Sequence, residues 1–172
     1  MKPKVKIVYS LYYFNEVIEP MLKLAEKKLA EFDFKNTDVE GSYDIPFEIA
    51  RSIKEDTIDV KDNISSFKGK GKKEIRDNIV QMEKLSQLNL NNECIYSGFL
   101  VLGCIIKGKT INHKAISTSI FTNLQKISIE NIIPIGNGIF NANNIEEAQE
   151  KNLECTEGAI RALIRGMRQQ GN

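Results

Sequence analysis

Apolar and polar residues alternate along this chain in blocks that predict strands and helices in turn. Residues 5–9 form a short apolar block that is typical of a buried strand, and residues 96–106 are nearly all apolar, as in a central strand covered on both faces. Residues 132–135 predict another short strand, which leads into Gly136-Asn137-Gly138, and residues 32–39 are weakly extended. These four blocks are the expected strands.

Between the strands, apolar residues recur at helical spacing. The regular part of the first helix is expected to begin near Pro20, and a second helix is expected at residues 45–53, with Pro46 in its first turn. One apolar face predicts a third helix, and the C-terminal segment predicts one interrupted helix or two consecutive ones, with Thr156 able to cap the second. These faces are Val17, Met21, Leu24, Ala25 and Leu29; then Ile116, Ile120, Leu124 and Ile127; then Ile145, Ala148, Ala159, Ile160, Leu163, Ile164 and Met167. Strands that alternate with helices imply a parallel α/β sheet with right-handed crossovers and helices on both faces.

The length of 172 residues suits a single domain, 1–172, with one atypical stretch. Residues 54–92 have few large apolar side chains and include the glycine–lysine tract of residues 68–73, so we expect an exposed insertion, partly helical around residues 75–85. A basic tract also suits nucleic acid. Acidic neighbours such as Glu74 and Asp77, and the lack of interleaved aromatic residues, favour a solvated loop.

Composition narrows the function classes. A net charge of +1 gives no electrostatic reason to expect nucleic acid or an acidic membrane as partner. No apolar run reaches the roughly 18 residues of a bilayer span, and residues 1–13 fit a buried first strand better than a signal peptide. Cys94, Cys104 and Cys155 are odd in number and lack paired spacing, which predicts reduced thiols in the cytoplasm and neither a disulfide framework nor a zinc site.

Ligands of parallel α/β sheets lie at the carboxyl ends of the strands, and polar segments follow the expected strands at residues 9–15, 39–46, 102–113 and 135–141. Phe14 is placed to stack on a planar ring or to pack the start of a helix. Asp44 is placed to accept hydrogen bonds from ligand hydroxyls or to cap the next helix.

The turn of residues 107–110 carries two lysines and a glycine at a helix start, which suits a phosphate group or an ordinary solvated turn. Its spacing is neither that of a Walker loop nor that of a dinucleotide fingerprint. His113, the one histidine, is either a surface residue or a catalyst. Cys104 ends a buried strand and is expected to be inert unless a positive neighbour lowers its pKa.

Five motifs in sequence order resemble those of the lumazine synthase family, over about residues 1–53 and 93–168. Tyr13-Phe14-Asn15 is similar to the family's Arg-Phe-Asn, residues 39–46 to Val-Pro-Gly-Ala-Phe-Glu-Ile-Pro, and residues 102–110 to Leu-Gly-Cys-Val-Ile-Arg-Gly-Glu-Thr. Residues 134–139 parallel the last-strand motif, and residues 144–148 parallel Thr-Ile-Glu-Gln-Ala.

The resemblance implies a three-layer α/β/α, flavodoxin-like sandwich with a central parallel four-stranded sheet, assembled as pentamers, decamers or sixty-subunit shells. It implies condensation of 5-amino-6-(D-ribitylamino)uracil with 3,4-dihydroxy-2-butanone 4-phosphate to 6,7-dimethyl-8-ribityllumazine, a step of riboflavin biosynthesis. It implies no metal and no organic cofactor. Much of the rate would come from holding the two reactants together.

Matching positions carry the family's roles onto this chain. Phe14 would stack on the pyrimidine, and the ribityl chain and the uracil edge would each be held by three consecutive residues. Lys109 and Thr110 would meet the phosphate, which a neighbouring subunit's Lys151 would also reach. The ribityl contacts are Ser42, Tyr43 and Asp44, and the backbone contacts to uracil are Cys104, Ile105 and Ile106.

The chain departs from the family at several of these positions. Asn112 stands where the family has its catalytic histidine, and His113 follows one residue later, about 100° further around a helix. Asn137 replaces an aromatic ring that covers the pyrimidine from the neighbouring subunit, and Lys151 replaces an arginine. Glu157 aligns loosely with a lysine.

These departures favour two hypotheses. One is a divergent synthase with proton transfer by His113 or water and with Asn112 orienting it. The other is a degenerate homologue that binds a ribityl-bearing heterocycle or forms a shell. A flavodoxin-type electron carrier fits less well, because the first loop lacks a hydroxyl-rich phosphate cradle.

Overall fold

The computed structural model describes residues 2–65 and 94–170, which divide into two compact units. One unit combines Met1–Ala50 with Tyr96–Asn172, and the other is Arg51–Ile95. Most of the predicted insertion at residues 54–92, with its glycine–lysine tract and its expected helix at residues 75–85, lies outside the described residues.

A single parallel sheet forms the centre of the larger unit. Its strands are β1 (Lys4–Ser10), β2 (Asp33–Val39), β3 (Gly98–Ile106) and β4 (Ile135–Ala142). They lie in the order β2-β1-β3-β4, and every neighbouring pair is parallel. The predicted four-stranded parallel sheet is therefore confirmed, with β1 and β3 in its middle as their apolar runs require.

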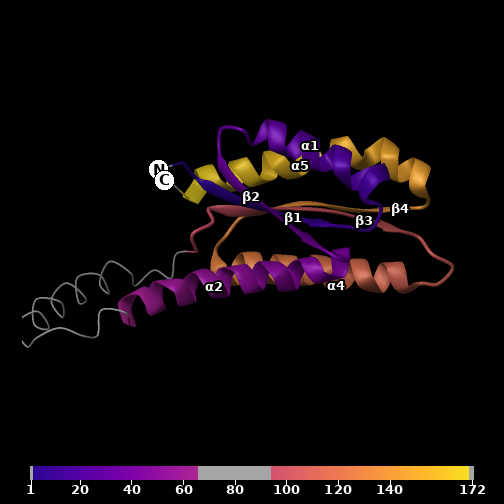
Figure 1. Ribbon diagram of the computed structural model, residues 1–172. Coiled ribbons are helices and arrows are strands. Elements are labelled where there is room, and N and C mark those ends of the chain that lie inside the picture. The colour runs from indigo at the N-terminus through magenta and orange to yellow at the C-terminus, as the bar shows by residue number, and fades with distance from the viewer. Residues whose placement is uncertain (1, 66–93, 171–172) are drawn as a thin grey trace, which may run out of the picture. The chain divides into compact units, whose positions relative to one another are not determined.

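Helices cover both faces of this sheet (Figure 1). The helices α1 (Glu19–Lys28) and α5 (Ile145–Gln170) lie on one face, and α4 (Asn112–Asn131) lies on the other with the beginning of α2 (Ile45–Ser65). This arrangement confirms the three-layer α/β/α sandwich. Because all strands run the same way, their carboxyl ends share one edge of the sheet.

The face under α1 and α5 carries the main hydrophobic core. Alternate residues of the central strands point to it, as the two-residue period of a strand requires. Buried side chains of α1 and α5 pack on these strand residues and shield them from solvent. The buried members of this cluster are Val5, Ile7, Val17, Ile18, Met21, Leu22, Ala25, Leu29, Leu100, Leu102, Cys104, Phe140, Ala142, Ala148, Ala159, Ile160 and Leu163.

The last strand lies later in the chain than predicted. We expected it at residues 132–135, with Gly136-Asn137-Gly138 following its end, but these glycines lie inside β4. A Cβ on Gly136 would come within 2.5 Å of the Ala159 carbonyl oxygen in α5, and one on Gly138 within 2.8 Å of the Val101 carbonyl oxygen. The two glycines therefore allow close packing of β4 on α5 and on β3.

Other element boundaries also differ from the prediction. The helix α5 is continuous, and Thr156 lies fully buried in its middle, where its hydroxyl donates to the Asn152 carbonyl at 2.7 Å instead of capping a second helix. The start of α1 agrees with Pro20, but a π-helical turn over Phe14–Ile18 precedes it.

The second predicted helix is longer than its apolar pattern indicated. The helix α2 continues to Ser65, well past the predicted end at residue 53, and an Arg51–Glu55 ion pair of 2.5 Å lies along its part in the smaller unit.

Among the described residues, no helix combines the length and apolar character that crossing a bilayer requires.

Candidate active site

An open cleft of about 240 Å³ lies at the carboxyl edge of the sheet, within the larger unit. Its lining comes from the loop after β1, from the connection between β2 and α2, from the end of β3 and from α4. The lining residues are Tyr12, Tyr13, Gly41, Ser42, Tyr43, Cys104, Ile105, Ile106 and Ile116. The structure thus brings together three of the four segments predicted to follow strands.

A tight turn after β1 presents two tyrosines to the cleft. The Leu11 amide donates to the Val39 carbonyl at 2.9 Å, and the Phe14 amide donates to the Leu11 carbonyl at 3.2 Å, so Tyr12 and Tyr13 lie at the tip. Tyr13 has φ 58° and ψ 35°, a left-handed conformation that costs a non-glycine residue roughly 1–2 kcal/mol. Its carbonyl accepts the Val17 amide at 2.9 Å, which fixes this conformation at the start of the π-helical turn.

Phe14 is not one of the residues that line the cleft. Its ring is half-buried, packs against the core cluster and lies 5.8 Å from the Tyr9 ring, at an interplanar angle of 36°. The structure therefore shows the packing alternative for Phe14, and its stacking on a ligand stays a prediction. Sequence reasoning missed Tyr12 as a lining residue, although a run of aromatic residues directly after a strand is an unusual pattern for a loop.

The floor of the cleft contains a hydroxyl group without a partner. Ser42 is 6% exposed, and its Oγ is buried and makes no hydrogen bond in the described structure. This oxygen occupies the space beside Gly103, where a Cβ would lie only 2.5 Å from it. A buried polar atom without a partner is unfavourable, so a ligand atom that bonded this hydroxyl would remove a penalty.

Cys104 contributes to the same floor as a neutral thiol. Burial, and to a lesser degree the nearby Cys155, raises the pKa of Cys104 to about 12. A thiol with a pKa raised in this way is a poor nucleophile at neutral pH, which agrees with the predicted inertness of Cys104. Ile105 and Ile106 follow it at the end of β3 and line the cleft, in the segment predicted to contact uracil.

The connection after β2 holds the two other predicted ribityl contacts. Tyr43 is exposed and lines the cleft. Asp44 Oδ2 accepts the Gly41 amide at 3.0 Å, so this carboxylate caps the short 3-10 turn Ser42–Asp44. The observed contact of Asp44 is thus with the turn that contains it and not with α2, the helix it was expected to cap, and contact with a ligand hydroxyl remains a prediction.

The predicted phosphate turn, residues 107–110, follows the lining residue Ile106 in the sequence but contributes no residue to the lining of the cleft. Lys109 and Thr110 are exposed between β3 and α4, and Asn112 is exposed as the first residue of α4. His113 is half-buried, and its Nδ1 lies 3.0 Å from the Thr110 carbonyl oxygen. A carbonyl only accepts hydrogen bonds, so Nδ1 carries the proton in this contact, and in the neutral ring Nε2 keeps its lone pair.

Two predicted residues lie on other parts of the surface. Asn137 is exposed within β4, and its Oδ1 accepts the Ile139 amide at 3.0 Å. Glu157, which aligns loosely with a family lysine, forms an ion pair of 3.5 Å with Lys28. Neither residue lines the cleft of its own chain, and the role predicted for Asn137 belongs to a neighbouring subunit's cleft.

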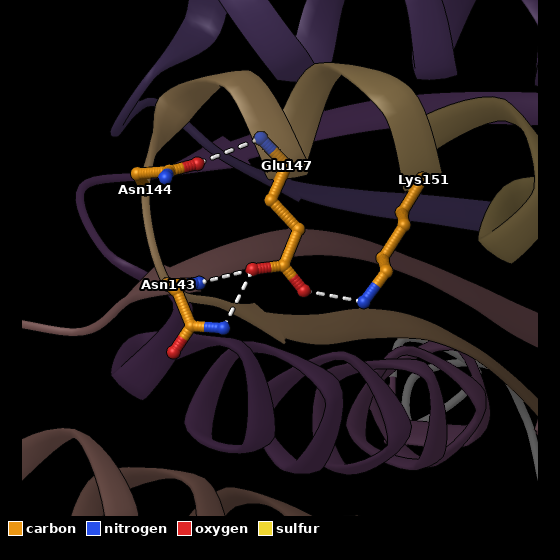
Figure 2. Close-up of polar contacts among 4 residues, drawn as sticks. All are labelled: Asn143, Asn144, Glu147 and Lys151. Carbon is orange, nitrogen blue, oxygen red and sulfur yellow. Dashed lines mark hydrogen bonds and ion pairs between the residues drawn. The ribbon is translucent and has the colours of Figure 1, made fainter.

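Lys151 lies in a polar network at the start of α5 (Figure 2). Its Nζ donates to Glu147, whose carboxylate also accepts the Asn143 backbone amide at 2.8 Å and the Asn143 side-chain amide at 2.7 Å. The Asn144 side chain accepts the Glu147 amide at 2.8 Å. The hydrogen bond from Lys151, followed by those from Asn143, lowers the pKa of Glu147 to about 2, and Glu147 in turn raises the pKa of Lys151. Lys151 is therefore a firmly charged cation on an exposed helix end.

Comparisons with known proteins identify relatives of this chain. Residues 61–168, more than half of the chain, match the family model described as 6,7-dimethyl-8-ribityllumazine synthase. A protein of that name from Limosilactobacillus reuteri is 28% identical over 155 residues, which cover 87% of this chain and 77% of the relative. One from Buchnera aphidicola is 48% identical over 56 residues, covering 33% of this chain and 35% of the relative. One from Blochmanniella pennsylvanica is 37% identical over 73 residues, covering 40% and 46%.

Proposed function

The chain belongs to the 6,7-dimethyl-8-ribityllumazine synthase family, and we propose that it is an active enzyme of riboflavin biosynthesis. The reaction is the condensation of 5-amino-6-(D-ribitylamino)uracil with 3,4-dihydroxy-2-butanone 4-phosphate. The observation that carries this proposal is the cleft, because residues of three family-like motifs, far apart in sequence, meet there.

Recognition of the ribitylaminouracil falls to the floor and rim of the cleft. The unpartnered Ser42 hydroxyl and the exposed Tyr43 hydroxyl offer hydrogen bonds to the ribityl chain, and Asp44 lies beside them in the sequence. The backbone at Cys104, Ile105 and Ile106 lies at the carboxyl end of β3, where it can pair with the uracil edge.

Recognition of the second substrate falls to the start of α4. Lys109 and Thr110 precede the helix, whose first backbone amides and dipole favour an anion. Lys151 of a neighbouring subunit would add a second positive charge. The assembly that supplies it, a pentamer or a multiple of pentamers in the cytoplasm, is part of the proposal.

Catalysis then needs little more than orientation and one proton carrier. Holding two reactants in register replaces a bimolecular encounter, and ring closure follows once they are aligned. His113 is the proposed general base, through the Nε2 that its Thr110 contact leaves unprotonated, with Asn112 orienting His113 or a water molecule. A positioned acid or base typically contributes about 10²–10⁴ in rate.

The direct test is to incubate purified protein with both substrates and to follow lumazine absorbance against the spontaneous condensation. We expect protein-dependent turnover, a fall of about 10² or more in kcat for His113→Ala, and a rise in KM for the phosphate substrate in Lys109→Ala. Lys23→Ala, an exposed lysine of α1, is the matched charge control and should leave both constants unchanged. Absence of turnover above the spontaneous rate at every protein concentration contradicts the proposal.

The second candidate is a homologue without catalysis that binds lumazine or riboflavin or forms a shell. The observation that favours it is Asn112, which offers no titratable proton at the position of the family histidine. Calorimetry separates the two functions. Tight binding of lumazine by the wild-type protein without turnover would favour the binding protein.

A further inference from the structure

The aromatic rings that reach the ligand cleft differ from the ring that the family motif selects. Tyr12 and Tyr13 line the cleft and are 59% and 40% exposed, whereas Phe14 is packed against Tyr9 and the core. The two tyrosine rings lie 6.4 Å apart between centroids at an angle of 45°. They form one aromatic wall of the cleft.

Both tyrosines are held in this position by contacts of the turn and of the neighbouring β2–α2 connection. The Tyr12 amide donates to Ser10 Oγ at 3.2 Å, and atoms of its ring lie 3.2–3.3 Å from the place where a Cβ on Gly41 would be. The Tyr13 carbonyl accepts the amides of Val17 and Ile18, which holds its left-handed backbone. A bulky residue at positive φ is rare. In this turn, the left-handed backbone at Tyr13 occurs together with a Tyr13 ring that lines the cleft and a Phe14 ring that packs on the core.

A second observation also indicates a ligand at this place. The buried Ser42 hydroxyl in the same cleft has no partner in the described structure. The cleft thus combines exposed aromatic faces with a polar atom that lacks a hydrogen bond, which suits a planar heterocycle with a polar substituent.

We propose that Tyr13, supported by Tyr12, is the residue on which the heterocyclic ring stacks in this protein, in place of Phe14. The inference rests on the proposed function, since it names the ring-binding residue of the same cleft. It assigns Phe14 a structural part: Phe14 anchors the loop on the core so that the two tyrosines face the ligand.

Tyr13→Gly is the most informative variant. Glycine adopts the left-handed conformation without strain, so the fold should keep its stability or gain some, while the stacking face is lost. We expect the KM for 5-amino-6-(D-ribitylamino)uracil to rise about tenfold with a smaller change in kcat. Tyr13→Phe keeps the stacking ring, so its KM should rise much less than that of Tyr13→Gly.

Phe14→Leu tests the competing assignment. It preserves apolar packing, so we expect a modest loss of thermal stability and an almost unchanged KM. An unchanged KM in Tyr13→Gly, or a tenfold rise in KM confined to Phe14→Leu, contradicts the inference. Turnover by the wild-type protein would in either case leave the proposed function intact.

A binding measurement makes the test independent of catalysis. The chain contains no tryptophan, so Tyr13→Trp introduces a single indole whose fluorescence should be quenched when 6,7-dimethyl-8-ribityllumazine binds. Tyr43→Trp places the indole at another lining position and provides a second reporter in the same cleft. Quenching at Tyr43→Trp alone contradicts stacking on Tyr13, and absence of binding by the wild-type protein in calorimetry contradicts both proposals.

Discussion

The two faces of the sheet are built in different ways. The face under α1 and α5 is a continuous apolar cluster, in which Leu163, Ile7 and Leu100 are fully buried. The face toward α4 and the beginning of α2 also buries apolar residues, but it contains an ion pair between Lys6 and Glu48 at 2.8 Å, with both side chains less than a tenth exposed.

The polar groups of the second face continue to the cleft. Ser117 on α4 donates its hydroxyl either to the His113 carbonyl or to Asn141 Oδ1, each at 2.6 Å, and Ser42 lies unpartnered at the floor. Non-directional apolar packing tolerates small changes, whereas each buried polar group depends on its partners. The first face therefore relies on apolar packing alone, whereas the second face combines apolar packing with buried polar groups that extend to the cleft.

The largest expected effect comes from breaking the buried ion pair. Glu48→Leu removes the carboxylate that neutralises the Lys6 ammonium, and loss of one partner of a buried pair costs about 3–5 kcal/mol of unfolding free energy. Urea unfolding followed by circular dichroism measures this loss. The Lys6 Nζ also lies 5.7 Å from the centroid of the Tyr96 ring, a cation–π contact that is worth less than this loss.

Two further variants sharpen the difference between the faces. Lys6→Met combined with Glu48→Leu replaces the pair by apolar groups and should restore most of the stability. Leu163→Ala on the first face should cost about 3 kcal/mol through a cavity, with no single second substitution that restores it as fully. Equal behaviour of the single and double variants at Lys6 and Glu48 would show that the pair does not act as a unit.

Ser42→Ala should act in opposite directions on stability and on binding. Removing a buried hydroxyl that has no partner should raise the unfolding free energy of the unliganded protein by about 1 kcal/mol. The same change should weaken binding of the ribitylated ligand, because the hydroxyl can no longer form a hydrogen bond with it. Thermal melts with and without lumazine measure both effects.

Ser117→Ala is the matched control on the same face. Its hydroxyl already has acceptors in the protein, so its removal should lower stability and leave ligand affinity largely unchanged. A loss of stability in Ser42→Ala without ligand would contradict the view that this hydroxyl serves a ligand.

The first face and the central strands could be predicted from the sequence for a physical reason. The apolar blocks at β1 and β3, and the helical spacing in α1 and α5, report burial directly. The position of β4 was missed because its glycines are explained by contacts with Ala159 in α5 and with Val101 in β3, which are distant in sequence. The interior position of Thr156 was missed because its partner is its own helix backbone.

The cleft was predicted as a place but only in part as a set of side chains. Strand ends are visible in the sequence, so the segments that contain Ser42, Tyr43 and Cys104 were expected to meet, and these three residues line one cleft. Their contacts with a ligand, which the family resemblance implies, stay predictions. Phe14 packs on the core and Tyr12 lines the cleft in a turn where Tyr13 has a left-handed backbone. The spacing of residues in the sequence does not reveal this backbone conformation. Local backbone conformation, and not residue type, decides which ring reaches the cleft.

The smallest expected effect lies at the exposed start of α5, where solvent screens polar contacts. The folded-state pKa of Glu147 is about 2, below its ordinary value of 4.5, so its contribution to stability is present above about pH 4.5 and is lost as the pH falls toward 2. Glu147→Gln should therefore melt at a lower temperature than wild type near pH 6, and the difference should shrink to zero as the pH approaches 2.

Glu146→Gln separates the contribution of the polar network to stability from the contribution of the helix dipole. Both acids lie in the first turn of α5 and interact with its dipole, but the structure gives the Asn143 and Lys151 contacts to Glu147. The pH-dependent loss in Glu147→Gln should therefore exceed that in Glu146→Gln, and about 1 M salt should reduce both. Equal losses in the two variants would mean that the helix dipole alone accounts for the effect. The Lys151–Glu147 contact would then contribute nothing to stability, and Lys151 could leave Glu147 for a phosphate without a loss of stability.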